Sequence, residues 1–170
     1  MAHRYNKNYN LSSPIHKSIP MKVFISGSIS KKTLDENDIA YMEQIVEGKR
    51  TILIGDADGV DRAVQQYLFE QNYQNVIVYF SGENVRHNIG NWQTKQIPNP
   101  DNLTGKPRYQ LKDKAMADDC DCGMMFWDGK SKGTQDNIDY MEKLGKYYLA
   151  LTTNDLLVGN LCKINNMIML

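Results

Sequence analysis

Short apolar runs and amphipathic stretches take turns along the chain, and this order predicts strands that alternate with helices. The apolar runs are rich in β-branched and aromatic residues and have the length of buried strands. They cover residues 22–25, 51–54, 76–80, 122–127 and 147–151. The stretches between most of them place apolar residues three and four positions apart, which is typical of helices with one buried face.

The predicted helices have recognisable starts and stops. Thr33 with Glu36 has the spacing of a capping box, and Gly48 ends that helix. A second helix begins at Asp61 and a third covers roughly 109–117. The last runs over 134–144, with Thr134 as a possible N-cap and Gly145 after it.

Strands that alternate with helices need crossover connections, which give a parallel sheet covered on both faces. We therefore predict an α/β fold: a Rossmann-like three-layer sandwich with a mainly parallel sheet of five or slightly more strands. Residues 83–107 have no clear period and form a stretch that is long for a compact domain. We expect that stretch to be either functional or mobile.

Length and composition limit the possible classes of protein. A chain of 170 residues suits one core, so we expect an N-terminal extension over 1–20 and a single nucleotide-binding domain over 21–170. Lys plus Arg and Asp plus Glu balance at 20 each, which argues against nucleic acid or a membrane surface as partner. The three cysteines lack the spacing of a disulfide framework or a zinc site, and no stretch resembles a membrane span. We expect a cytoplasmic protein without a metal or cofactor.

The apolar tail after Thr153 leaves two alternatives open. It either closes the core or packs against another copy of the chain, which would make the protein a homo-oligomer.

The richest polar clusters follow two of the predicted strands, over residues 55–62 and 127–134. Each lies in the order strand, glycine turn, helix start, which brings backbone N–H groups and the positive end of a helix to one point. In parallel sheets, ligands bind beyond the carboxyl ends of the strands. Neither cluster matches the spacing of a dinucleotide fingerprint or a P-loop. The two turns together predict a site for a phosphate-bearing ligand, such as a nucleotide.

The candidate ligand-binding residues share a place at or beside these strand ends. They are Gly27, Ser28, Gly55, Asp56, Gly59, Arg86, Gly129, Lys132, Gly133 and Thr134. Asp61 and Asp128 are the candidates for catalysis or ribose contact, although Asp61 also suits an N-cap.

Several other side chains have two interpretations. Arg86 is either a solvated loop charge or a phosphate clamp. Trp92 and Trp127 either belong to the core or stack on a base. Residues 112–114 (Lys-Asp-Lys) are interpreted as the solvent-facing side of the third helix.

Three motifs in this order resemble the SLOG superfamily of Rossmann-like nucleotide-binding proteins. They are 23–28 (Val-Phe-Ile-Ser-Gly-Ser), the glycine turn from Gly55 to Asp61, and Trp-Asp-Gly-x3-Gly-Thr over 127–134. The chain is most similar to the small branch related to the YspA/YpsA proteins, and it resembles the LOG phosphoribohydrolases more distantly. The resemblance covers roughly residues 21–152 and implies a nucleotide or nucleotide derivative as ligand.

The LOG hydrolases carry a Pro-Gly-Gly-x-Gly-Thr-x-x-Glu signature whose glutamate is catalytic, and that position falls on Asn137 here. An amide cannot stabilise an oxocarbenium-like state as a carboxylate does. Two functions follow: a nucleotide-binding protein that also hydrolyses the N-glycosidic bond, or a non-catalytic sensor whose ligand controls assembly or partner contacts. A flavodoxin-like phosphoprotein or phosphatase, based on Asp56 and Asp58, is a third.

Overall fold

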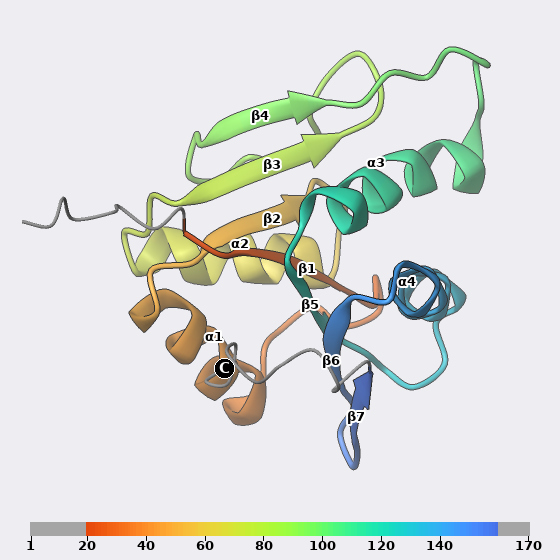
Figure 1. Ribbon diagram of the computed structural model, residues 1–170. Helices are drawn as coiled ribbons and strands as arrows, with labels where there is room; N and C mark the ends of the chain where they lie inside the picture. Colours follow the sequence, from red (N-terminus) through yellow and green to blue (C-terminus); the bar gives the residue numbers. More distant parts are fainter. Residues whose placement is uncertain (1–19, 160–170) are drawn as a thin grey trace, which may run out of the picture.

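The computed structural model describes residues 20–159 and has the predicted alternation of strands and helices (Figure 1). The strands are β1 (Lys22–Gly27), β2 (Thr51–Gly55), β3 (Val76–Phe80), β4 (Gln93–Gln96), β5 (Cys122–Phe126), β6 (Tyr147–Leu151) and β7 (Leu156–Gly159). The helices are α1 (Glu36–Glu47), α2 (Val60–Glu70), α3 (Gly105–Asp119) and α4 (Lys132–Leu144). The chain therefore has the predicted α/β fold.

The strands form one seven-stranded sheet in the order β4-β3-β2-β1-β5-β6-β7. All neighbours are parallel except β6 and β7, which are antiparallel. From β1 the chain moves outward through β2 and β3 to β4, and then crosses back to place β5 on the other side of β1. The order thus reverses between β1 and β5, which is the topological switch point where such sheets bind ligands.

Alternate residues of β1 point to opposite faces of the sheet, and each face is covered by its own helices. Val23 and Ile25 belong to a core cluster with apolar residues of α1 and α2. Phe24 belongs to a second cluster with residues of α3 and α4. Figure 1 shows the same division of the helices into two layers around the sheet. The result is the predicted three-layer sandwich.

The predicted helix starts need three corrections. Helix α1 begins after Asp35, whose side chain accepts from the backbone of Asp38 in a capping box, so the box of Thr33 and Glu36 is wrong. The N-cap of α2 is Gly59 and that of α4 is Ser131. The side chains of Asp61 and Thr134 therefore do not cap their helices and lie within the first turn.

The sequence pattern missed both outer strands. Strand β4 has the sequence Gln-Thr-Lys-Gln, is exposed throughout, and pairs only along β3. It lies within the stretch predicted to be irregular, and that stretch is anchored by Trp92, whose buried indole donates to the Tyr73 carbonyl at 2.8 Å. At the other edge, β7 leaves Leu156, Leu157 and Val158 exposed. The rest of the apolar tail lies outside the described residues, as do residues 1–19.

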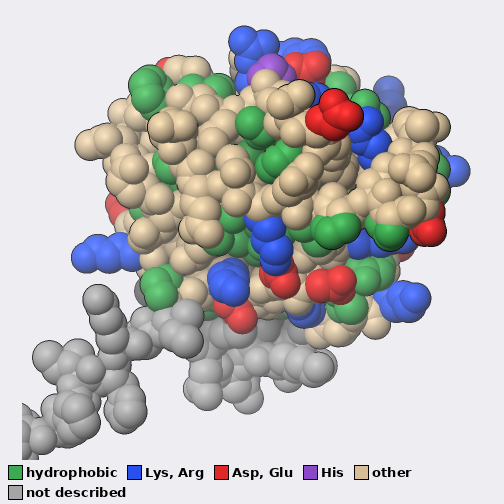
Figure 2. Space-filling model, turned by 90° about the horizontal axis from the view of Figure 1, so that it is seen from above, with side chains coloured by type: hydrophobic (Ala, Val, Ile, Leu, Met, Phe, Trp, Pro, Cys, Tyr) green, Lys and Arg blue, Asp and Glu red, His purple; other side chains and the backbone are tan. Residues whose placement is uncertain are grey.

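Charged side chains of both signs are interspersed on the face of the molecule that Figure 2 shows, with no broad field of one sign. This distribution agrees with the balanced composition of the whole chain. Within the described part of the chain, none of the helices combines the length and apolar character that crossing a membrane requires.

Candidate functional site

A cavity of about 270 Å³ lies at the switch point, where β1, β2 and β5 end. Its walls come from the turns after these strands, from Arg86, and from one side of α3 and the start of α4. The lining includes Gly27, Asp58, Asp61, Arg86, Tyr109, Lys112, Asp113, Asp128, Ser131, Gly133, Thr134 and Asn137. Two hollows of about 530 and 570 Å³ lie beside the α1–α2 pair and beside the end of β4, and two of about 310 and 290 Å³ lie around the turn between β6 and β7.

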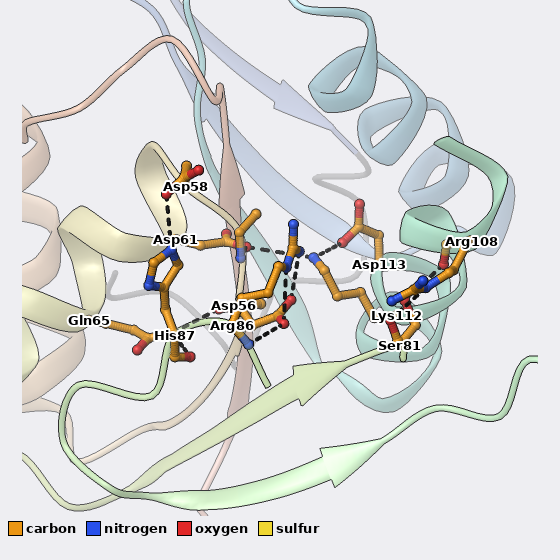
Figure 3. Close-up of polar contacts among 12 residues, drawn as sticks. Asp56, Asp58, Asp61, Gln65, Ser81, Arg86, His87, Arg108, Lys112 and Asp113 are labelled. Carbon is orange, nitrogen blue, oxygen red and sulfur yellow. Dashed lines mark hydrogen bonds and ion pairs between the residues drawn. The ribbon is translucent and has the colours of Figure 1, made fainter. Parts of the chain in front are cut away.

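Three ionisable side chains meet in one wall of this cavity (Figure 3). The Lys112 ammonium lies 2.8 Å from a carboxylate oxygen of Asp113 and 3.6 Å from one of Asp61. Lys112 is 3% exposed and Asp61 is 7% exposed. The interpretation of residues 112–114 as a solvent-facing surface is therefore wrong for Lys112.

The surroundings shift the pKa values of Asp61 and Lys112 and keep Lys112 charged. Burial raises the pKa of Asp61, and the opposing attraction of Lys112 does not cancel that effect. Burial alone would lower the pKa of Lys112, but the charges of Asp113 and Asp61 raise it overall. A backbone N–H from Ala57 also donates to Asp61 at 3.1 Å. Asp61 is thus a buried carboxyl that binds a proton more readily than an exposed aspartate.

The end of β2 accommodates this group only because residue 55 is glycine. A Cβ on Gly55 would lie 2.3 Å from the Asp61 carboxylate and 2.4 Å from the Lys112 ammonium. Gly55 therefore does not line the cavity itself but makes room for two side chains that do.

Asp56, the next residue, holds Arg86 in place. Its carboxylate, 2% exposed, accepts from the Arg86 guanidinium at 2.8 and 3.2 Å and from the Arg86 backbone at 3.0 Å. Burial raises the pKa of Asp56, but the bonds from Arg86 outweigh it and the net shift is downward. The guanidinium also lies 4.7 Å from the centre of the Tyr109 ring. Arg86 is therefore a fixed cation in the cavity wall rather than a solvated loop charge.

The segment after Arg86 is tied to the same turn. Gln65 is fully buried and donates to the carbonyls of Gly55 and His87 at 2.9 and 3.1 Å. Its side-chain oxygen accepts from the Ile89 backbone at 3.0 Å. The His87 ring lies 2.9 Å from the Asp58 carboxylate (Figure 3). These contacts hold the loop after β3 against the start of α2.

The turn after β5 is organised by hydroxyls instead. Ser28 and Ser131 share a hydrogen bond of 2.6 Å, and Ser131 and Thr134 share one of 3.1 Å. Asp128 accepts from Ser30 at 2.7 Å and from the backbone of Ser131 at 2.7 Å. Partial burial raises the pKa of Asp128, but these bonds lower it overall. The Asp128 carboxylate is thus engaged in shaping its own turn.

The residues predicted for ligand binding, together with Asp61 and Asp128 predicted for catalysis, divide into three groups. Those that line the cavity are Gly27, Asp61, Arg86, Asp128, Gly133 and Thr134. Those directly behind it are Ser28, Gly55 and Asp56, which bond to or make room for lining residues. Gly59 and Gly129 line other hollows, and Lys132 lies exposed outside the cavity walls.

The contribution of α3 to the site was not predicted from the sequence. Tyr109, Lys112 and Asp113 lie on one side of that helix and continue into the buried Met116 and Ala117. Their spacing is that of a single helical face. A lysine and an aspartate inside an otherwise apolar face were therefore the signal that could have identified them.

The two tryptophans and two cysteines lie outside this cavity. Trp92 belongs to the core, and Trp127 packs beside the second core cluster with its indole N–H on the Ser131 carbonyl at 3.1 Å. Cys120 and Cys122 are buried thiols. Among residues 20–159, no group of three or more His, Cys, Asp and Glu side chains could hold a metal ion. Cys162 lies outside the described residues.

Fold and site together define a doubly wound α/β protein with a charged cavity at its switch point. Comparisons of this chain with protein-family models, curated proteins and solved structures found no match. The resemblance to the SLOG superfamily remains a prediction that rests on the three sequence motifs.

Proposed function

We propose that the switch-point cavity binds a nucleotide or a nucleotide derivative. The observation that carries this proposal is the group of buried Asp61, buried Lys112 and half-buried Asp113, which lies in the cavity wall where three parallel strands end. A sheet edge of this kind is where α/β proteins bind such ligands. Buried ionisable groups with shifted pKa values are typical of functional sites.

The start of α4 supports a position for the phosphate. No side chain caps the helix at Ser131, and the hydroxyls of Ser131 and Thr134 lie beside its first turn. Apart from the adjoining residues and the backbone of its own helix, no atom lies within 4 Å of the point where a Cβ on Gly133 would be, so a ligand can approach the backbone there. The positive end of the helix favours an anion at this point.

The side of the cavity formed by Asp61 and α3 supports positions for the ribose and the base. Carboxylates such as those of Asp61 and Asp113 accept hydrogen bonds from ribose hydroxyls. The Tyr109 ring is 40% exposed beside Arg86 and offers a flat surface on which a base can stack.

The raised pKa of Asp61 supports hydrolysis of the N-glycosidic bond as the reaction. In this step the C1′–N bond breaks, its electron pair stays on the base nitrogen, and protonated Asp61 supplies the proton there. Water then adds to C1′ and returns a proton to the Asp61 carboxylate. The positive charge that develops on the sugar is stabilised by nearby carboxylates such as that of Asp113.

A second candidate function is a sensor that binds the same ligand without turnover. It is favoured by Asn137, which lines the cavity and donates to Ser26 at 3.2 Å but cannot transfer a proton as a carboxyl does. The exposed apolar residues of β7 would then serve assembly into a homo-oligomer or contact with a partner.

Calorimetric titration with AMP tests binding, and chromatographic assay for released base over a panel of nucleoside monophosphates tests turnover. We expect the natural chain to bind AMP and to release base. We expect Asp61→Asn to bind AMP but to release base at least about a hundredfold more slowly. Binding without release from any compound would favour the sensor, whose ligand should then change the mass measured by light scattering. No binding to any compound would contradict both functions.

We also propose a cytoplasmic location. Burial raises the pKa of the Cys120 thiol to about 11 and that of Cys122 to about 12. Buried, unpaired thiols of this kind suit a reducing compartment, where disulfides are rare.

A further inference from the structure

A second hollow, of about 530 Å³, lies on the other side of the β2–α2 turn. Its walls come from the turn that precedes α1, from α1 itself, and from the exposed side of α2. This volume is within the range of about 300 to 1,000 Å³ that is usual for small-molecule sites, whereas the switch-point cavity lies slightly below it. The smaller cavity alone is therefore tight for a whole ligand of ordinary size.

The two spaces meet at Asp58, which lines both of them. This carboxylate lies 2.9 Å from the His87 ring, and contact with His87 together with the charges of Lys32 and Arg62 lowers its pKa. Lys32 and Arg62 are exposed and line the second hollow. Asp58, Lys32 and Arg62 form a ridge between the two spaces. Because it combines two permanent cations with one carboxylate, this ridge has a net positive charge.

The walls of the second hollow suit a flat, largely apolar group. Leu34, Ile39, Ala63 and Tyr67 supply aliphatic and aromatic surface. Burial and the nearby acidic side chains raise the pKa of Tyr67, so its ring carries a neutral hydroxyl. Gln66 and Glu70 also line the hollow; the Gln66 amide donates to Glu70 at 2.8 Å, and its oxygen can accept from a base. An aromatic ring and an amide of this kind are what proteins use to hold a nucleobase.

We infer that this hollow is a second subsite for a dinucleotide, and this inference rests on the proposed function of the first cavity. One nucleoside unit occupies the switch-point cavity, and the base of the other lies against Tyr67. The phosphate of the first unit stays at the start of α4, and the second phosphate crosses the ridge at Asp58, where Lys32 and Arg62 bind it. Guanidinium and ammonium groups are the usual protein ligands of a diphosphate.

The test compares three probes by calorimetric titration of the full chain: AMP, ADP-ribose and diadenosine diphosphate. We expect diadenosine diphosphate to bind at least about tenfold more tightly than AMP, with ADP-ribose between them because it reaches the ridge without a second base. The double variant Lys32→Ala/Arg62→Ala should lose most of that gain and keep the natural affinity for AMP. Tyr67→Leu should weaken only diadenosine diphosphate, by about fivefold.

The matched control is Lys114→Ala/Lys143→Ala, which removes the same charge from exposed positions on α3 and α4 outside both spaces. It should leave all three affinities unchanged, and thermal melting should show that every variant is folded. Equal affinity for AMP and diadenosine diphosphate would overturn the subsite while leaving the proposed function intact. A gain that survives in the double variant would overturn the role of the ridge. If none of the probes binds, both the subsite and the proposed function fail.

Discussion

The glycine turns after β2 and β5 have similar sequence patterns, but they make different contacts in the structure. In the turn after β2, the aspartates reach outward: Asp56 binds Arg86, and Asp61 meets Lys112 from α3. In the turn after β5, Asp128 accepts from its own turn and from Ser30, and Ser28 bonds to Ser131. The first turn joins distant segments through buried charge, whereas the second is joined to the turn after β1 by hydroxyl hydrogen bonds and leaves open space beside Gly133.

We infer from this difference that the first turn contributes mainly to stability and the second mainly to ligand binding. Charges buried between segments are costly to disturb, because removal of one partner leaves the other without compensation. A turn that is held by hydroxyl and backbone hydrogen bonds has no buried charge to compensate, so its backbone can face a ligand at a smaller cost in stability. Substitutions in the first turn and its partners should therefore affect folding most, and substitutions in the second should affect binding most.

The largest effect is expected for Lys112→Met, which breaks the buried charge group of the first turn. Asp61 and Asp113 would lose the cation that lies 3.6 and 2.8 Å from them. We expect the free energy of unfolding, measured by urea denaturation, to fall by about 3 to 5 kcal/mol. Lys114→Met, two residues further along α3 and exposed, is the control and should change it by less than about 0.5 kcal/mol. A similar small loss in both variants would contradict the comparison.

Gly55→Ala tests the same turn from the backbone side. The added methyl group would lie within 2.4 Å of both Asp61 and Lys112, so the two side chains would have to move apart. We expect a loss of about 1 to 3 kcal/mol in the free energy of unfolding, as for other overpacked sites. Because the strain acts through the charge group, combining Gly55→Ala with Lys112→Met should cost less than the sum of the two losses. Additive losses would show that the methyl group clashes with something else.

The inner strands and the layer order could be predicted from the sequence, because buried parallel strands are continuous apolar runs. The edge strand β4 could not, because Gln93–Gln96 lies exposed on the sheet edge and is fixed by pairing with β3 rather than by its own side chains. The capping positions were also misplaced. Asp35, Gly59 and Ser131 are as suitable chemically as the residues predicted, and only the tertiary path of the turn decides between them.

The candidate site could be predicted only where it follows the strands. Asp61 and Gly133 come directly after strands whose ends must meet at one edge, so topology alone brings them together. Lys112 and Tyr109 come from α3, a helix that packs across the sheet. No local sequence pattern predicts which strand ends this helix covers. The contribution of α3 therefore becomes visible only when the crossover is known.

The pH dependence of stability separates the two aspartates of the first turn. The folded-state pKa of Asp61 is raised, so its contribution is full below about pH 3.9 and is lost as the pH rises through the folded pKa. That of Asp56 is lowered, so its contribution is present above about pH 3.9 and is lost as the pH falls through the folded pKa. From pH 7 toward pH 4, Asp61 should thus add stability, by about 1.4 kcal/mol for each unit of its shift.

Urea denaturation of the natural chain and of Asp61→Asn between pH 7.5 and 3 measures this effect. The variant should lack the gain toward pH 4 and keep the loss at still lower pH that comes from Asp56. A gain of the same size in both proteins would assign the protonation to another group.

The smallest effect on stability, and the opposite sign, is expected for Gly133→Ala in the second turn. Gly133 lies in the first turn of α4 without a positive φ, and no atom outside the adjoining residues and its own helix backbone lies within 4 Å of the new methyl group. Alanine restricts the unfolded chain, so we expect a gain of about 0.4 to 1 kcal/mol in the free energy of unfolding. The methyl group would nevertheless occupy the cavity and weaken AMP binding by about tenfold in calorimetric titration. Lys132→Ala, at the preceding position and outside the cavity, is the control and should leave AMP affinity unchanged. If Gly133→Ala also leaves AMP affinity unchanged, the phosphate does not lie over this turn.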